Sequence, residues 1–181
     1  MQPTWQYVRE LTQQYRNARV EYWLNESLFT FGWWTLVVTT IGLFIVWIFI
    51  LDKKRIFEIV TYGLMVTTIA TFGDTLGLSL LLWDYPKALT PIPQIAEIHN
   101  VQMPIIYMII YQYFTTWKAF LIAAAINAFV FALILEPLLA WLQIYQLYDW
   151  NSLYSLVPYF VIAAALKWII NKFKQMDQHY Q

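Results

Sequence analysis

The sequence predicts an all-α polytopic membrane protein, a helical bundle of five transmembrane helices preceded by an interfacial amphipathic helix. Of the 181 residues, 60% are hydrophobic and only 12% are charged, whereas about 25% of the residues in soluble domains are charged. So few charges cannot cover a water-facing surface of this size, which excludes an ordinary soluble globule and a disordered chain. Apolar runs of about 20 residues, enough to cross about 30 Å of hydrocarbon, recur along the chain.

Composition also limits the chemistry. Eleven basic residues balance eleven acidic ones, which argues against a nucleic-acid partner. The chain contains no cysteine, so a disulfide framework or a thiol catalyst is excluded. Two histidines and five glycines are too few for a histidine-built metal site or a glycine-rich phosphate loop. The sequence therefore predicts neither a metal nor a cofactor.

Residues 1–28 form the first predicted unit. Apolar and aromatic side chains recur there at spacings of three, four and seven, on one face of a helix over residues 4–28: Trp5, Val8, Leu11, Tyr15 and Tyr22. Such a helix can lie in the membrane interface with its rings at headgroup level. The alternative is a solvated tail helix that packs on the bundle.

Residues 29–171 form the predicted transmembrane domain, and residues 172–181 a cytoplasmic tail. The predicted spans cover about 31–51, 56–82, 101–116, 119–142 and 153–170. The proline-rich segment 83–101 is expected to be a structured loop, with a re-entrant piece near Ile92–Ile98 left open. Lysine and arginine gather near residues 52–55, 117–118 and the C-terminus. The positive-inside rule therefore predicts an outside N-terminus and a cytoplasmic C-terminus.

The second span has a predicted packing face. Small and polar residues recur on it at helical spacing: Gly63, Thr67, Ala70, Thr71, Asp74 and Gly77. Because small residues let helices approach closely in a bilayer, this face should point into the bundle. Val66, Ile69, Phe72 and Leu76 are expected to lie mostly away from it. Lys118 and Lys167, near span ends, are expected to extend their ammonium groups to the interface.

The second and fourth spans end in similar sequences. Each carries one carboxylate in its outer part and is followed by aromatic residues around an aspartate, Trp83-Asp84-Tyr85 and Tyr148-Asp149-Trp150. The third and fifth spans each have a proline in the first turn. This pattern predicts two parallel helical hairpins after a leading helix.

Asp74 and Glu136 are the candidate catalytic residues. They lie 18 and 17 residues from the starts of their predicted spans, which places both roughly 25–27 Å from the cytoplasmic ends. An ionisable group at membrane depth is a functional-site hypothesis, because its burial costs a few kcal/mol. The structural alternative is a carboxylic acid that stays protonated and hydrogen-bonds a neighbouring helix.

A ligand-binding pocket is predicted around these acids. It would be lined by the candidate ligand-binding residues His99, Trp83, Tyr85, Tyr107 and Tyr159. His99 titrates near neutral pH, which suits proton transfer. The alternative is an aromatic belt, because tryptophan and tyrosine gather at membrane interfaces without binding a ligand.

Several short sequences resemble those of a family of small, uncharacterised multi-pass membrane proteins of endospore-forming Firmicutes. They are Trp83-x-Tyr85-Pro86, Pro104-x-x-Tyr107, Tyr111-Gln112-Tyr113, Trp117-Lys118, Glu136-Pro137-Leu138 and Lys167-Trp168. The resemblance covers roughly residues 50–170 and implies a bacterial plasma (inner) membrane location. Members tend to have an acidic residue just before the proline of span three, where this chain has His99-Asn100-Val101-Gln102.

A fainter resemblance links Asp74, Gly77 and Trp83-x-Tyr85 to membrane lycopene cyclase domains. The paired acidic residues that follow a proline in those domains are absent here, where only Glu97 lies nearby.

Three functions remain open at this stage. The first is a non-enzymatic bundle that binds a lipid-like ligand or a membrane partner. The second is a membrane-embedded enzyme acting on a polyprenyl or lipid substrate, with Asp74 or Glu136 as acid or base and aromatic rings stabilising a cation. The third is a small proton-coupled transporter, which would need to form a homo-oligomer.

Overall fold

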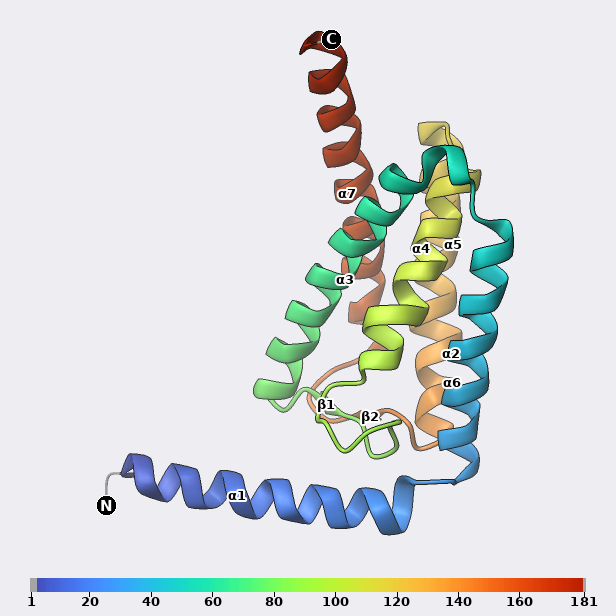
Figure 1. The fold of residues 1–181 in the computed structure, drawn as a ribbon. Helices are drawn as coiled ribbons and strands as arrows, with labels where there is room; N and C mark the ends of the chain where they lie inside the picture. The colour runs from blue at the N-terminus through green and yellow to red at the C-terminus, as the bar shows by residue number, and fades with distance from the viewer. Residues whose placement is uncertain (1–2, 181) are drawn as a thin grey trace.

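The computed structural model describes residues 3–180, with side chains to residue 177, and is all-α apart from one pair of two-residue strands. This confirms the predicted fold class. Residues 1–2 of the predicted N-terminal segment and residue 181 of the predicted tail lie outside the described residues. Figure 1 shows a bundle of upright helices with one long helix lying across its lower end.

The upright helices and the transverse helix follow one another along the chain with short connections. The α-helices are α1 (Trp5–Tyr22), α2 (Phe31–Ile50), α3 (Ile56–Ser79), α4 (Met103–Tyr113), α5 (Trp117–Val130), α6 (Glu136–Trp141) and α7 (Ser152–Tyr180). The strands are β1 (Trp83–Asp84) and β2 (Gln146–Leu147). Wider π-helical turns cover Trp23–Ser27, Glu97–Gln102 and Phe131–Leu135, and a 3₁₀ turn covers Lys53–Arg55.

Four helical stretches among the described residues are long and apolar enough to cross a membrane. They are Phe31–Ile50, Lys53–Ser79, Trp117–Trp141 and Ser152–Asp177. The third predicted span, 101–116, is a shorter helix that begins in the turn at Glu97 and ends at Tyr113. It lies among the other upright helices (Figure 1). The count of five spans therefore stays a prediction, whereas the other four apolar helices are present.

Threonine side chains begin three of the helices. Thr4, Thr30 and Thr116 have extended backbones, and their hydroxyl oxygens accept hydrogen bonds from the first-turn N–H groups of Tyr7, Trp33 and Ala119. These N-caps satisfy donors that have no partner inside the helix. The cap at Thr116 starts α5 two residues before the predicted boundary.

Helices α3 and α6 end in the same way. The residues after their last turns, Leu81 and Gln143, have positive φ angles of 55° and 59°. Leu82 N–H then donates to Gly77 O, and Ile144 N–H donates to Leu139 O, both at 2.9 Å. These are the bonds of a Schellman ending, and they direct both chains into the antiparallel β1–β2 pair. The segments that leave α3 and α6 thus share their geometry, and the strands that follow lie side by side.

The small-residue face of α3 packs against the bundle. Gly63, Ala70, Asp74 and Gly77 are buried there, and a Cβ at Gly63 would meet the flexible side chain of Met108 on α4. The expectation that Val66 lies mostly away from this face is wrong, because Val66 is fully buried. Since α3 packs on both α4 and α7, its buried face is wider than contact with one helix would require.

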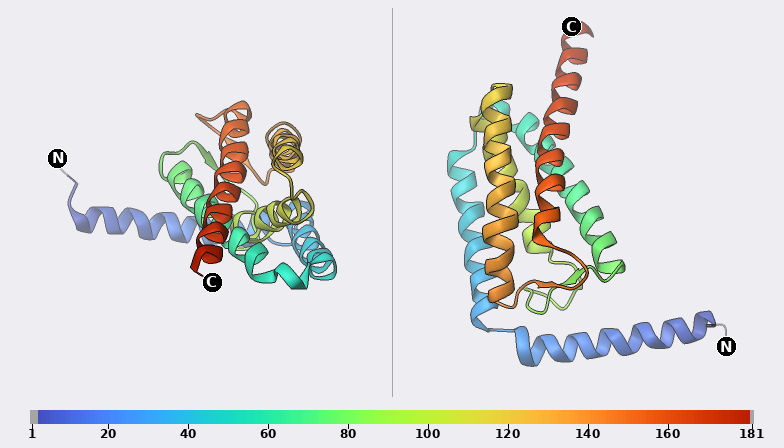
Figure 2. Two further views of the ribbon diagram at one scale, coloured as in Figure 1. Left: turned by 90° about the horizontal axis from the view of Figure 1, so that it is seen from above. Right: turned by 180° about the vertical axis from the view of Figure 1, so that it is seen from behind.

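Helix α1 lies across the end of the bundle, as Figure 1 and Figure 2 show. None of its residues is buried, and Arg19 joins it to the loop that follows β1. The Arg19 guanidinium pairs with Asp84 at 3.1 Å and donates to the carbonyl oxygens of Tyr85 and Pro91. Because the apolar side chains of α1 stay exposed, this geometry suits the predicted interfacial helix, which remains a prediction.

Candidate functional site

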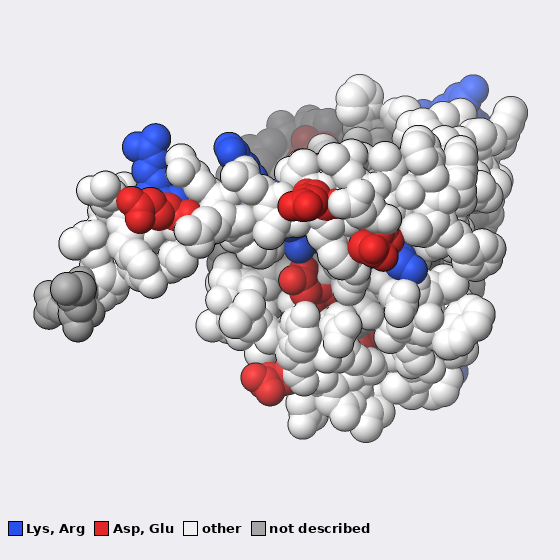
Figure 3. Space-filling view, turned by 90° about the horizontal axis from the view of Figure 1, so that it is seen from below, with Lys and Arg blue, Asp and Glu red and all other residues white. Residues whose placement is uncertain are grey.

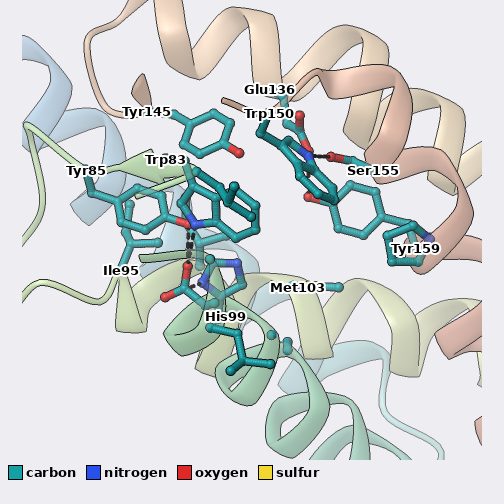
Figure 4. Close-up of a pocket in the computed structure, with 18 of the residues that line it drawn as sticks. Trp83, Tyr85, Ile95, His99, Met103, Glu136, Tyr145, Trp150, Ser155 and Tyr159 are labelled. Atoms are coloured by element: carbon teal, nitrogen blue, oxygen red, sulfur yellow. Dashed lines mark hydrogen bonds and ion pairs between the residues drawn. The ribbon is translucent and has the colours of Figure 1, made fainter. Parts of the chain in front are cut away.

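A cavity of about 310 Å³ lies at the end of the bundle where the β1–β2 pair closes it. Its walls come from α3, α6, α7 and the loop between β1 and α4, as Figure 4 shows. Most of the lining is apolar, for example Ile69, Leu139 and Ile162. Polar side chains from two opposite walls face this apolar space.

Asp74 of α3 forms the first polar wall. Asp74 is only 4% exposed. Its Oδ1 accepts hydrogen bonds from the Tyr85 hydroxyl at 2.6 Å and from Trp83 Nε1 at 3.1 Å. Burial raises the pKa of the Tyr85 hydroxyl, and the Asp74 carboxylate raises it further. Tyr85 therefore remains a hydrogen-bond donor at neutral pH. The loop thus folds back to supply both donors.

Gly77 makes this arrangement possible. It lies one turn after Asp74 on α3, and a Cβ at Gly77 would overlap the indole ring of Trp83. Because Gly77 has no side chain, the Trp83 ring can lie against α3. In this position its Nε1 reaches Asp74. Gly77 therefore allows the hydrogen bond between Trp83 and Asp74 as well as close packing.

His99 lies beside Asp74, in the wide turn before α4. Its Nδ1 is 3.6 Å from Asp74 Oδ2, beyond ordinary hydrogen-bond distance. This nitrogen is buried and has no hydrogen-bond partner among the described residues. The turn itself is held in place because Glu97 Oε1 accepts a hydrogen bond from Leu89 N–H at 2.8 Å.

Glu136 of α6 forms the opposite polar wall (Figure 4). Its Oε1 accepts a hydrogen bond from the Tyr159 hydroxyl at 2.8 Å. Its Oε2 is buried and makes no hydrogen bond within the described part of the chain. Pro137 cannot donate to the preceding turn, and the wide turn Phe131–Leu135 lies directly before it. Such π-helical turns occur frequently at functional sites.

Aromatic rings connect the two walls. Tyr85 stacks on Tyr145 with ring centroids 5.5 Å apart, and Trp83 meets Trp150 edge-on at 5.3 Å. Trp150 Nε1 in turn donates to the Ser155 hydroxyl at 2.9 Å. The rings therefore form a continuous surface between the Asp74 side and the Glu136 side.

The cavity brings together most of the residues that the sequence predicts for the site. Asp74, Glu136, His99, Trp83, Tyr85 and Tyr159 all line it. Tyr107 does not. Its hydroxyl donates to the backbone oxygen of Tyr159 at 2.8 Å, so it holds α7 in place from behind. The structure therefore does not bring Tyr107 to the lining of this cavity, and the roles of all seven residues remain predictions.

Among the polar and aromatic lining residues, three were not predicted: Tyr145, Trp150 and Ser155. A signal for two of them exists in the sequence. Tyr145 follows the end of α6 by four positions, as Trp83 follows the end of α3, and Trp150 belongs to the second aromatic exit. Treating the two exits as equivalent positions would have placed both rings near the cavity.

The cavity opens sideways between α3 and α7. These helices lie close together near one end of the bundle and diverge toward the β1–β2 end (Figure 1, Figure 2). Leu76 and Leu80 line the cavity on α3 while being 47% and 66% exposed. Pro158 lines it on α7 and is also exposed. An apolar rim thus faces the surface that these apolar helices present to a membrane.

The polar groups suit hydrogen bonding and proton transfer. Among the described side chains, no three histidine, aspartate or glutamate residues are grouped so that they could hold a metal ion. Glu136 Oε2 can accept a hydrogen bond, and His99 Nδ1 can accept or donate one according to its protonation. The arrangement can therefore hold a polar group between the two walls.

The contact between Gly77 and Trp83 can be tested by a double-mutant cycle. We expect Gly77→Ala to destabilise the protein by about 1–3 kcal/mol, because the new methyl group displaces a packed ring. In Gly77→Ala/Trp83→Leu the two effects should be clearly less than additive. Thermal unfolding in detergent measures both. Gly42→Ala, where a Cβ meets nothing within 4 Å, should not destabilise the protein, because alanine is the better helix former. Strict additivity would contradict the proposed contact.

The chain matches no protein-family model, no curated protein and no solved structure. The resemblance to the Firmicutes membrane family thus rests on its short sequences alone. The cavity and its polar walls are the features of the structure that bear on function.

Proposed function

We propose that this protein binds a lipid-like molecule, with an apolar chain and a hydrogen-bonding polar end, in the cavity between α3 and α7. One observation carries the proposal. Two buried polar atoms, His99 Nδ1 and Glu136 Oε2, make no hydrogen bond among the described residues, and both residues line the same apolar cavity. Leaving a buried polar atom unpaired costs about 1–3 kcal/mol. A ligand that pairs with both atoms removes this cost.

The shape of the cavity indicates how the ligand lies. A volume of about 310 Å³ is at the lower end of the range for small-molecule sites. It can hold a polar end group and the first part of a chain. The rest of the chain would leave through the exposed apolar rim formed by Leu76, Leu80 and Pro158. This side opening lets a lipid enter without crossing water.

The polar end should contain a hydroxyl or similar donor. Glu136 Oε1 is already occupied by Tyr159, and Asp74 Oδ1 by Trp83 and Tyr85. The second carboxylate oxygen on each wall and the His99 ring remain for the ligand. Carboxylate oxygens on two walls, with the His99 imidazole beside Asp74, favour a neutral or cationic polar group over a phosphate, which carboxylates would repel.

A second candidate is an enzyme acting on a polyprenyl or lipid substrate. The observation that favours it is the pair formed by His99 and Asp74, with Nδ1 3.6 Å from Oδ2. Trp83 and Tyr85 fix the other oxygen of Asp74, which orients the carboxylate toward the imidazole. Such a pair can move a proton to or from a bound substrate, and the ring-lined walls can stabilise a developing cation.

We infer that the protein lies in a bacterial plasma membrane with the α1 end outside. The end bearing the α2–α3 turn, the α4–α5 turn and the C-terminus carries seven of the basic residues but only Asp52, Glu58 and Asp177 as acids. Seen from below, the α1 end shows charges of both signs on a mostly uncharged surface (Figure 3). The positive-inside rule supports this orientation.

A cavity-filling substitution tests the binding proposal. Gly73 lines the cavity, and a Cβ there meets nothing within 4 Å, so Gly73→Trp can occupy the space without displacing the core. We expect copurifying lipid-like molecules, measured by mass spectrometry of extracts, to fall about tenfold, equivalent to about 1.4 kcal/mol. Gly42→Trp, at an equally open glycine outside the cavity, is the matched control. Equal retention in both variants would show that the cavity is not the binding site.

Cellular lipid analysis separates the enzyme from the binding protein. If the enzyme hypothesis is right, cells producing Asp74→Asn should accumulate the same lipid or isoprenoid species as cells lacking the protein, because the amide cannot assist the His99 ring as a carboxylate does. Wild-type protein should restore the normal profile. An unchanged profile in both strains would remove the enzyme hypothesis and leave the binding proposal intact.

Cysteine labelling tests the orientation without background, since the chain has no cysteine. A cysteine at residue 90 should react with a membrane-impermeant reagent added to intact cells, and one at residue 53 should react only after lysis. The reverse pattern would overturn the inferred topology.

A further inference from the structure

A second cavity, also of about 310 Å³, lies toward the opposite end of the bundle. It is bordered by the beginning of α3, the turn between α4 and α5, and the second half of α7. Its α3 residue Glu58 is sixteen positions before Asp74, about 24 Å along the helix. The cavity is therefore separate from the site described above.

Basic side chains dominate this second cavity. Its lining contains three cations, Arg55, Lys167 and Lys174, but one carboxylate, Glu58. Glu58 pairs with Arg55 at 3.0 Å and with Lys174 at 3.2 Å. One carboxylate cannot neutralise three cations, so the lining carries an excess of two positive charges.

The α7 contribution follows from helical spacing. Lys167, Asn171 and Lys174 are separated by four and three residues, which places them on one face of a helix. All three line the cavity, whereas Lys172, between them in sequence, does not. The face that α7 turns toward α3 is thus the one that carries two lysines and an amide.

Lys167 is the innermost of these cations. The expectation that it extends to the interface is wrong, because the residue is only 3% exposed. Its Nζ donates to the carbonyl oxygens of Phe114 and Thr115 at 2.8 and 3.0 Å and lies 4.1 Å from the Phe120 ring centroid. These carbonyls follow the end of α4 and need donors. The ammonium group of Lys167 therefore makes two hydrogen bonds and a cation–π contact while its charge stays at the inner end of the cavity.

We propose that this cavity binds the phosphate of an anionic phospholipid headgroup. The excess positive charge of the lining and the half-exposed ammonium group of Lys174 suit a phosphate oxygen. A lipid is favoured because large apolar side chains stand exposed next to the charged ones in sequence: Phe57 on α3, and Trp168 and Phe173 on α7. Acyl chains can lie against these side chains while the phosphate enters the cavity. Basic pockets between membrane helices recognise anionic headgroups in this way.

Native mass spectrometry of the detergent-solubilised full chain tests the proposal, with phosphatidylglycerol and phosphatidylcholine as probes. We expect preferential retention of phosphatidylglycerol. Lys174→Gln should weaken this retention about fivefold, the effect of one basic residue near an anionic lipid. Lys174 has a side chain that is 49% exposed, so its replacement should not unfold the protein.

Lys172→Gln is the matched control, because it removes the same charge from the same helix outside the cavity. It should leave retention within about twofold of wild type. Equal losses in both variants would show attraction to net charge alone and would overturn the site. Displacement of phosphatidylglycerol by millimolar inorganic phosphate would show that free phosphate, and not a lipid, is the ligand. Equal retention of both lipids would also contradict the proposal.

Discussion

The two hydrogen bonds that Trp83 and Tyr85 donate to Asp74 determine how the β1–β2 end of the bundle is built. A carboxylate that is buried between apolar helices needs hydrogen-bond donors from the protein, since the lipid chains supply none. Here the donors come from the loop immediately after the same helix. Bringing them back requires the left-handed residue Leu81, the missing side chain at Gly77 and the β1–β2 pair. The cavity exists because this loop closes one end of the space where α3 and α7 diverge.

Much of this fold could be predicted from hydrophobic runs and charge placement, because both follow from the thickness and polarity of a membrane. The four long apolar helices and the inward face of α3 are examples. The wide turns at Glu97–Gln102 and Phe131–Leu135 could not be predicted, since they add one residue per turn without changing composition. They also change the direction in which His99 and Glu136 point relative to a regular helix. The spacing of apolar residues in the sequence does not reveal such a change.

The candidate site was more predictable than its hydrogen bonding. Asp74 and Glu136 stood out because charges are rare in the spans, and both face the same cavity. Tyr107 lies outside the cavity because its hydroxyl donates to the backbone oxygen of Tyr159. Lys167 points inward because its ammonium group donates to a carbonyl oxygen after the end of α4. A sequence does not show which side chain will meet such a group. The two cavities also differ in the ionisable side chains that line them: carboxyl groups in one, and mainly cations in the other.

The most direct test of the central claim is an electron cryo-microscopy map of the protein in nanodiscs prepared with lipids from its own host. The account predicts non-protein density in the cavity between α3 and α7. Its polar end should lie within hydrogen-bond distance of Glu136 Oε2 or His99 Nδ1, and its chain should leave past Leu76 and Leu80. A cavity that is collapsed, or in which Glu136 and His99 are paired by other side chains of the protein, would contradict the account.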